Sequence, residues 1–206
     1  MAGSGLVLVG YVLIHMLANL QIFAGAAAID GYARGLRQRP ILLWSVRALL
    51  AAAFTAHVVL AAQLARIKRA ARPVRYRARA SWRAHPAARS LIWSGALLAV
   101  FLVVHLANLT WGTLHPGFTP LAVHHNVVTL FRVRLASALY VVAVLALGLH
   151  VAHGAWSLLQ SLGLIAGDGS RVLRIGARIL AAALTAGFLA VVVAASAGAL
   201  SVGGAP

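Results

Sequence analysis

Long apolar runs, each close to the length of a membrane-spanning helix, dominate this chain of 206 residues. A helix needs roughly 20 mostly apolar residues to cross the hydrocarbon region of a bilayer. Membrane barrel strands would show short segments of alternating polarity instead, and the sequence contains none. We therefore predict an all-α fold, with residues 1–206 forming a single membrane domain. Stretches of turn-forming or charged residues divide it into a bundle of five transmembrane helices, at about 3–27, 41–66, 90–112, 134–160 and 173–200.

The composition excludes several classes of site. Only 10% of the residues are charged, compared with about 25% in an ordinary soluble domain. Because the chain has no cysteine, it holds no disulfide, no iron–sulfur cluster of its own and no thiolate-bound metal. Its only acidic side chains are Asp30 and Asp168, which excludes a carboxylate-bridged di-iron centre and hydrolysis by paired carboxylates.

The net charge of +16 is placed in loops, where it predicts an orientation rather than a nucleic-acid partner. Residues 66–89 contain nine of the 18 lysines and arginines, and Arg171, Arg174 and Arg178 flank the fifth predicted helix on the same side. Cytoplasmic loops carry such an excess of basic residues. We therefore expect loop 66–89 on the cytoplasmic side of a bacterial membrane, with the N-terminus inside and the C-terminus outside. We expect no binding to nucleic acid.

Four histidines lie inside apolar segments, each in a different predicted helix: His15, His57, His105 and His150. Ionisable side chains within a membrane are costly and usually mark function. The sequence also contains a weak repeat, because residues 15–20 read HMLANL and residues 105–109 read HLANL. The second histidine of each half follows 42 or 45 residues later. The repeat predicts a pseudo-symmetric four-helix bundle, against which the fifth, histidine-free helix packs.

Depth in the membrane sorts these histidines into two pairs. A helix rises about 1.5 Å per residue, and His57 and His150 lie nine and ten residues from the cytoplasmic ends of their helices. His15 and His105 lie twelve and seven residues from the outer ends, which is a poorer match. Two imidazoles on opposite faces of one iron are what a six-coordinate b-type haem requires. We therefore predict two haem b groups, one held by an inner pair, His57 with His150, and one held by an outer pair, His15 with His105.

Other interpretations of the histidines remain open. They could be unrelated buried histidines, each bonded to neighbouring backbone or hydroxyl groups. They could also form a proton relay, although relays generally use acidic partners and the only acid near a predicted helix is at the end of the first. His153 competes with His150 as a ligand, because residues three apart share one face of a helix.

Charged residues near the predicted helix ends are candidate partners for haem and quinone. Haem propionates need cationic or hydrogen-bonding partners at each membrane face. Arg47 is the candidate for the outer haem, and Arg66 and Lys68 are weaker ones for the inner haem, although each could instead snorkel to the interface. Asp30 could cap the first helix and take up protons at an outer quinone site, or serve only as a turn residue. The loop histidines are expected to be polar surface, with a contact to a quinone or propionate as the alternative; they are His85, His115, His124 and His125.

Short motifs in register with the four histidines extend over nearly the whole chain. They are His15-Met16 with Asn19-Leu20-Gln21 and Phe23, then Leu36-Arg37, Leu43-Trp44 and Arg47, then His57 and Ala71-Arg72-Pro73, then Phe101 through His105-Leu106 to Thr110, and Gly148-Leu149-His150 followed by His153-Gly154 and Trp156-Ser157. With these motifs the chain resembles the dihaem cytochrome b that anchors succinate dehydrogenase or fumarate reductase (succinate:quinone oxidoreductase) in the membrane, in its single-polypeptide, five-helix form.

The resemblance implies the same ligand pairs, His57 with His150 near the cytoplasm and His15 with His105 near the outer face. It favours His150 over His153, because the family's fourth ligand precedes a histidine- or asparagine-glycine and a tryptophan-serine pair. It also implies partners: a flavoprotein that oxidises succinate, and an iron–sulfur subunit that passes electrons to the inner haem. The chain would carry these electrons to a membrane quinone, expected to be menaquinone, without acting on succinate itself.

Both partner subunits are expected on the cytoplasmic side, and the whole complex could form oligomers in the bilayer. Loop 66–89 could be their docking surface, or a plain orientation signal that contacts anionic lipid. Two other functions remain open. One is a dihaem cytochrome b of another quinone-linked dehydrogenase, such as a hydrogenase or formate dehydrogenase. The other is a haem-free membrane transporter or assembly protein, which predicts no b-type absorbance in the purified chain.

Overall fold

The computed structural model describes residues 1–71, 86–164 and 169–201, and this part of the chain is all-helical. Five of its helices are long and apolar enough to cross a membrane. They are α1 (Ala2–Leu20, followed by the short 3-10 helix η1, Gln21–Ala24), α3 (Pro40–Ala70), α4 (Pro86–Leu109), α6 (Arg134–Ser161) and α7 (Gly169–Ser196). The predicted bundle of five helices is confirmed, and the ends of the apolar spans differ from the predicted ends by no more than four residues.

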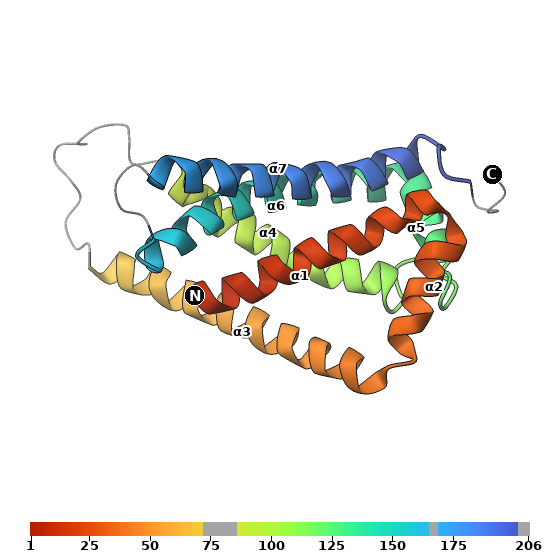
Figure 1. Cartoon of the computed structure of the whole chain (residues 1–206), viewed down its shortest axis with the longest axis horizontal. Helices are drawn as coiled ribbons and strands as arrows, with labels where there is room; N and C mark the ends of the chain where they lie inside the picture. Colours follow the sequence, from red (N-terminus) through yellow and green to blue (C-terminus); the bar gives the residue numbers. More distant parts are fainter. Residues whose placement is uncertain (72–85, 165–168, 202–206) are drawn as a thin grey trace.

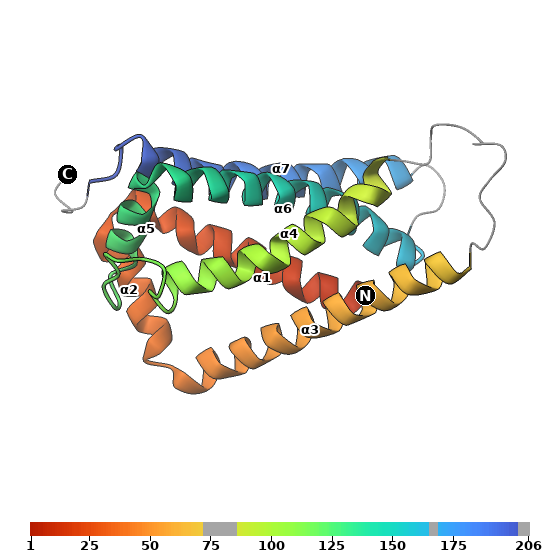
Figure 2. The same cartoon turned by 180° about the vertical axis from the view of Figure 1, so that it is seen from behind.

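The long helices lie along one axis of the molecule, and two short helices close one end (Figures 1 and 2). These are α2 (Ala26–Arg37) and α5 (Val123–Arg132), and we call this the α2–α5 end. α1 begins near the opposite end, which we call the N-terminal end, and α3 returns to it (Figure 1). Because consecutive long helices alternate in direction, residues far apart in the sequence lie at similar depths in the bundle.

Helices α2 and α5 occupy segments that the sequence predicts as connections. Gly25, with a φ of 94°, separates η1 from α2 in a backbone conformation that favours glycine. α5 is largely enclosed, and the expectation that His115 and His124 lie on the polar surface is wrong. Their side chains are only 6% and 5% exposed, respectively. The reason is that α2 and α5 pack against the ends of the spanning helices, so their apolar faces and the loop before α5 extend the core.

α7 is held against its neighbours by two groups of buried side chains. At the α2–α5 end, Val192 of α7 packs in a cluster with Phe131 of α5. Further along, Leu184 packs with Met16 of α1 and Val151 of α6. α7 therefore contacts helices from both halves of the chain, as expected for a histidine-free packing helix.

Two glycines allow these helices to approach closely. A Cβ atom at Gly148 of α6 would overlap the Thr185 hydroxyl of α7, and one at Gly187 of α7 would overlap the sulfur of Met16. Small residues at helix interfaces are the usual means of close packing in membranes, where the hydrophobic effect does not drive helices together. The contact at Met16 also fixes α1 next to His15.

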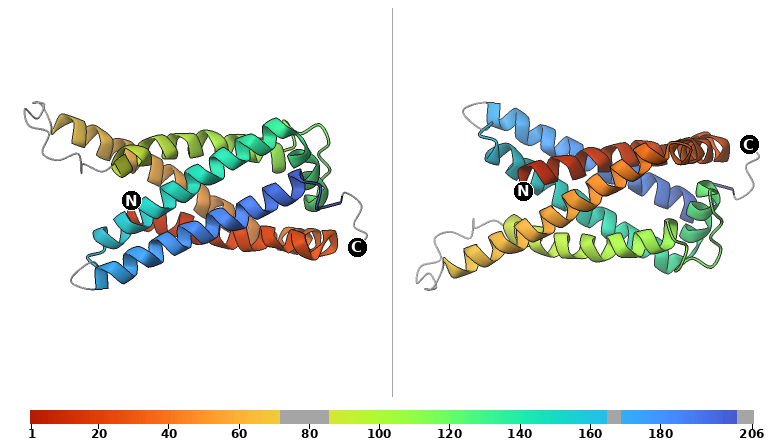
Figure 3. Two further views of the ribbon diagram at one scale, coloured as in Figure 1. Left: turned by 90° about the horizontal axis from the view of Figure 1, so that it is seen from above. Right: turned by 90° about the horizontal axis from the view of Figure 1, so that it is seen from below.

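α3 is much less enclosed than the other long helices. It crosses the bundle obliquely (Figure 3), and Ala53 is its one buried residue. α6, by contrast, buries Tyr140, Ala143, Val144, Ala146 and Val151. The helix that carries His57 is therefore held to the bundle by few side chains of this chain.

Candidate functional site

Two of the four intramembrane histidines meet toward the N-terminal end. The imidazole rings of His57 on α3 and His150 on α6 have centroids 6.3 Å apart and an interplanar angle of 63°. The other two helices of the predicted pseudo-symmetric bundle contact them through hydroxyl groups. Ser4 Oγ of α1 lies 3.3 Å from His57 Nδ1, and Ser94 Oγ of α4 lies 3.1 Å from His150 Nδ1. Four helices thus build the surroundings of one histidine pair.

Glycines next to these serines leave room for the imidazole rings. A Cβ atom at Gly5 would lie 3.6 Å from His57 Cε1, and one at Gly95 would lie 3.3 Å from His150 Cε1. Both rings therefore lie close to the backbone of the neighbouring helix. A larger residue at Gly95 would press directly on His150.

The other two histidines meet nearer the α2–α5 end. The rings of His15 on α1 and His105 on α4 have centroids 5.9 Å apart and are nearly perpendicular, at 87°. Ser4 precedes His15 and Ser94 precedes His105 by 11 residues. At about 1.5 Å per residue, the two pairs are therefore about 16 Å apart along the helices. The structure thus brings together both pairs that the sequence predicts, at two depths.

Aromatic side chains surround the His15–His105 pair. The ring centroids of four of them lie within 6.0 Å of one or other imidazole: Tyr11, Phe101, Phe188 and Tyr140. Tyr140 is only 4% exposed, and its hydroxyl oxygen lies 3.3 Å from His105 Nδ1. Aromatic rings supply large apolar surfaces, and the tyrosine adds a polar group that needs a partner when buried. This pair is therefore enclosed mainly by apolar surface.

His15 differs from the other three intramembrane histidines because its Nε2 lies near the side-chain amide of Asn19. The Asn19 side-chain amide donates to the His15 carbonyl oxygen at 2.7 Å and lies 3.4 Å from His15 Nε2. Because an amide nitrogen is only a donor, it can form the longer contact as a hydrogen bond only when His15 Nε2 carries no proton. In His57, His105 and His150 it is instead Nδ1 that lies next to a hydroxyl group.

Both pairs have the spacing of two imidazoles on one metal ion. Metal–imidazole bonds of about 2 Å put the two ring nitrogens about 4 Å apart and the ring centroids about 6 Å apart; the observed centroid distances are 6.3 and 5.9 Å. No group of three or more His, Cys, Asp or Glu side chains that could hold a bare metal ion occurs in residues 1–71, 86–164 and 169–201. Haem iron needs only two axial ligands from the protein. Each histidine pair supplies this number of ligands.

His153 belongs to neither pair. Its Nδ1 donates to the Leu149 carbonyl oxygen of the preceding turn, at 2.9 Å. The structure places the ring of His150, and not that of His153, opposite His57.

The candidate propionate contacts lie on α3. The Arg47 guanidinium lies over the Trp44 ring, 4.9 Å from its centroid, and its charge is within electrostatic range of Tyr11. Since Tyr11 stacks on His15, Arg47 is placed on the side of the His15–His105 pair. Arg66 and Lys68 are exposed at the other end of α3.

Asp30 has a different position from the one expected. It lies within α2 rather than in a turn, and its Oδ1 accepts a hydrogen bond of 2.9 Å from the backbone N–H of His124. The first N–H groups of a helix lack partners within the helix, and a carboxylate stabilises that end. Asp30 therefore caps α5, not the first transmembrane helix, and joins α2 to α5. A role in a quinone site stays a prediction.

A polar network that the sequence analysis missed joins loop 110–122 to α5. The Asn126 side chain accepts from the Thr119 backbone N–H and donates to the Thr119 carbonyl oxygen, both at 2.8 Å. His115 Nε2 lies 3.1 Å from Thr129 Oγ1, whereas His115 Nδ1 is buried without a partner in the described structure. Burial, and secondarily the charge of His125, lowers the pKa of His115. The signal for this network was the amphipathic pattern of residues 123–132.

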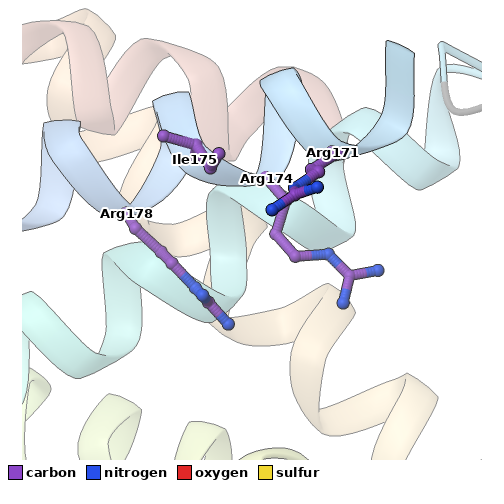
Figure 4. Close-up of a pocket in the computed structure, with 4 residues that line it drawn as sticks. All are labelled: Arg171, Arg174, Ile175 and Arg178. Atoms are coloured by element: carbon purple, nitrogen blue, oxygen red, sulfur yellow. The ribbon is translucent and has the colours of Figure 1, made fainter. Parts of the chain in front are cut away.

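The basic residues at the start of α7 gather around one hollow. Arg171, Arg174 and Arg178, with Ile175, line a space of about 360 Å³ (Figure 4). The Arg174 guanidinium lies 4.2 Å from the ring centroid of Trp156 on α6. The expected basic loop 66–89 is described only at its two ends. Its residues 72–85, which include His85, lie outside the described residues, as does Asp168.

Comparison with known proteins adds no relative: no family model matches the chain, and no curated protein or solved structure is significantly similar to it.

Proposed function

We propose that this chain is the dihaem cytochrome b membrane anchor of a succinate:quinone oxidoreductase. The observation that carries the proposal is the presence of two histidine pairs at two depths, each contributed by two helices and each with the spacing of axial ligands. The family resemblance supports the identity of the electron donor, an iron–sulfur subunit fed by a flavoprotein. The electron acceptor is a membrane quinone, which we expect to be menaquinone.

The chain's own residues would bind and enclose the cofactors. His57 and His150 would hold one haem, and His15 and His105 the other. Bound haem supplies reversible one-electron transfer, at a potential set by axial ligands, polarity and burial. Aromatic side chains enclose the His15–His105 pair, and hydroxyl groups contact the His57–His150 pair. Arg47 is the candidate contact for a propionate of the first of these haems.

The proposal places the N-terminal end in the cytoplasm of a bacterium. Arg171, Arg174 and Arg178 belong to that end, and the excess of lysine and arginine there is typical of cytoplasmic loops. The flavoprotein and iron–sulfur subunits would dock on this face, close to the His57–His150 pair. The α2–α5 end, with Asp30 and Arg47, would face outward and is the candidate side for quinone.

The decisive experiment measures haem in the purified chain, by a pyridine haemochrome assay and a reduced-minus-oxidised spectrum. We expect two haem b per chain. One haem would retain only the His57–His150 assignment, whose predicted depths match better. A chain that binds no haem would contradict the proposal and favour a transporter or assembly protein.

A second experiment identifies the electron donor. In membranes that contain the complete complex, succinate should reduce both haems, and formate or hydrogen should not. Reduction by formate or hydrogen alone would assign the chain to a different quinone-linked dehydrogenase with the same ligand pairs.

A further inference from the structure

The serine hydroxyl groups next to the His57–His150 pair have a defined polarity. Ser4 Oγ donates to the Met1 carbonyl oxygen at 2.9 Å, and Ser94 Oγ donates to the Ser90 carbonyl oxygen at 2.6 Å. A hydroxyl has a single proton to donate. Because each proton is used within its own helix, each serine oxygen can only accept a hydrogen bond from the histidine beside it.

This polarity determines where each imidazole carries its proton. His57 Nδ1 and His150 Nδ1 must donate to Ser4 and Ser94, over 3.3 and 3.1 Å. In a neutral imidazole with its proton on Nδ1, the other nitrogen carries the free lone pair. Nε2 of both histidines therefore has the lone pair that a metal ligand needs.

His115 shows that contact with a hydroxyl does not by itself produce this tautomer. The Thr129 hydroxyl donates to the His125 carbonyl oxygen at 2.7 Å, so it accepts from His115 Nε2, 3.1 Å away. The same argument thus gives the proton to Nε2 in His115 and to Nδ1 in His57 and His150. The Nδ1–H tautomer is a property of the intramembrane pair.

The two serines occupy equivalent places in the internal repeat. Ser4 and Ser94 each stand 11 residues before the first histidine of their half, and each is followed by a glycine, Gly5 or Gly95. In each case the glycine leaves space for the same ring that the serine contacts. One short motif, used once in each half, therefore orients one histidine of the pair on a neighbouring helix.

We propose that Ser4 and Ser94 are positioning residues, which hold His57 and His150 as Nδ1–H tautomers with Nε2 available to the haem iron. This proposal rests on the proposed function, because it needs a haem between the two rings. An acceptor for Nδ1–H raises the basicity of a ligating imidazole. A more basic ligand favours ferric iron, so the serines lower the potential of this haem relative to one without them.

The test compares Ser4→Ala and Ser94→Ala with the wild-type anchor in the complete complex, by redox titration of the two haem spectra. Removal of such a hydrogen-bond partner of a ligand typically lowers metal affinity or activity 10- to 100-fold. We expect each variant to change the ferrous-to-ferric ratio of one haem about tenfold, a rise of about 59 mV for one electron. The other haem should keep its potential. Ser94→Thr retains a hydroxyl and should restore the wild-type value.

Ser161→Ala is the matched control. Ser161 Oγ also donates to the preceding turn, to the Ser157 carbonyl oxygen at 2.8 Å, and it contacts no histidine in the described structure. Unchanged potentials in both alanine variants would overturn the proposal, as would an equal shift of both haems or the same shift in Ser161→Ala. Loss of one haem in Ser94→Ala that Ser94→Thr restores would support it.

Failure of the proposed function can be told apart from failure of this inference. If the wild-type chain binds no haem, the proposed function fails before any variant is made. The tautomers can still be read from the ¹⁵N shifts of the imidazoles in the haem-free chain. There, a proton on Nε2 of His57 and His150 would overturn the positioning role of Ser4 and Ser94.

Discussion

The two histidine pairs share helices α1, α4 and α6, but in exchanged roles. α3 and α6 supply the histidines toward the N-terminal end, where α1 and α4 supply the hydroxyl contacts of Ser4 and Ser94. At the second pair α1 and α4 supply the histidines, and α6 supplies the hydroxyl of Tyr140. One pair is therefore contacted by serines close to the backbone, and the other lies among aromatic rings.

This difference indicates that the two sites respond to different substitutions. At the His57–His150 pair the neighbouring helices are so close that backbone and small side chains determine the ring positions. At the His15–His105 pair larger aromatic rings fill the space. There, packing and the hydroxyl of Tyr140 determine the positions of the imidazole rings. Substitutions on one side should leave the other site intact, because about 16 Å of helix separates them.

The largest expected effect is the loss of a single haem on removal of one ligand. His57→Ala and His105→Ala should each bind one haem b instead of two, because one axial ligand cannot hold the iron in six-coordinate form. The haemochrome assay measures the content, and the remaining spectra should differ between the two variants. His153→Ala, on the same helix as His150, should retain both haems. If the two alanine variants lost the same haem, the assignment of separate pairs would be wrong.

A bulky residue at Gly95 should disturb only the pair near the N-terminal end. Its Cβ alone would lie 3.3 Å from His150 Cε1, so the side chain of Gly95→Leu would occupy the position of the ring. Overpacking of this kind typically costs 1–3 kcal/mol, and we expect a several-fold loss of one haem with the other retained.

Gly10→Leu provides the matched control, because a Cβ at Gly10 of α1 has no neighbour within 4 Å among the described atoms. Its haem content, measured by the same assay, should equal that of the wild type. Equal losses in the Gly10 and Gly95 variants would show that the effect comes from membrane insertion and not from the histidine.

Tyr140→Phe should affect the other pair, and more weakly. It removes the hydroxyl that lies 3.3 Å from His105 Nδ1 and keeps the ring that packs on Phe101 and Phe131. One hydrogen bond contributes about 1 kcal/mol, which is roughly 40 mV for one electron. Redox titration should show this shift in one haem only, and Tyr32→Phe, with an exposed ring, should show none. A shift of the haem near Ser4 would contradict the arrangement.

The membrane-spanning helices and the pairing of the histidines could be predicted from the sequence. The length of an apolar segment and the rise of a helix per residue are local properties. His57 and His150 meet, as do His15 and His105, although the contacts between side chains of different helices were not predicted. Ser4-Gly5 and Ser94-Gly95 were missed although they extend the same repeat. A serine or glycine in an apolar helix has no evident partner until the neighbouring helix is in place.

The α2–α5 end could not be predicted in the same way. α2 and α5 are short and mix arginine, histidine and asparagine with apolar residues, a composition that also suits a polar loop. Their burial depends on the ends of the five long helices, so the amphipathic pattern of residues 123–132 indicates a helix but not what covers its apolar face. The cap between Asp30 and α5 joins positions 94 residues apart, and His115 is buried for the same reason.

The smallest expected effect is a dependence of stability on pH that arises from His115, at the α2–α5 end. Burial lowers the pKa of His115 in the folded chain, and the charge of His125 adds to the shift. In the unfolded chain the pKa of this histidine is about 6.5. The unfolded state therefore binds more protons, so the stability that neutral His115 provides is present above about pH 6.5 and is lost as the pH falls through the folded pKa.

Thermal unfolding in detergent at several pH values, with His115→Gln beside the wild type, measures this contribution. The variant should lose less stability on acidification, although it is less stable at neutral pH because Thr129 loses its partner. The intramembrane histidines titrate alike in both proteins, so only the difference between the two pH profiles reports on His115. Parallel profiles would mean that His115 has the same pKa in the folded and the unfolded chain, and that the α2–α5 end does not exclude water from this side chain.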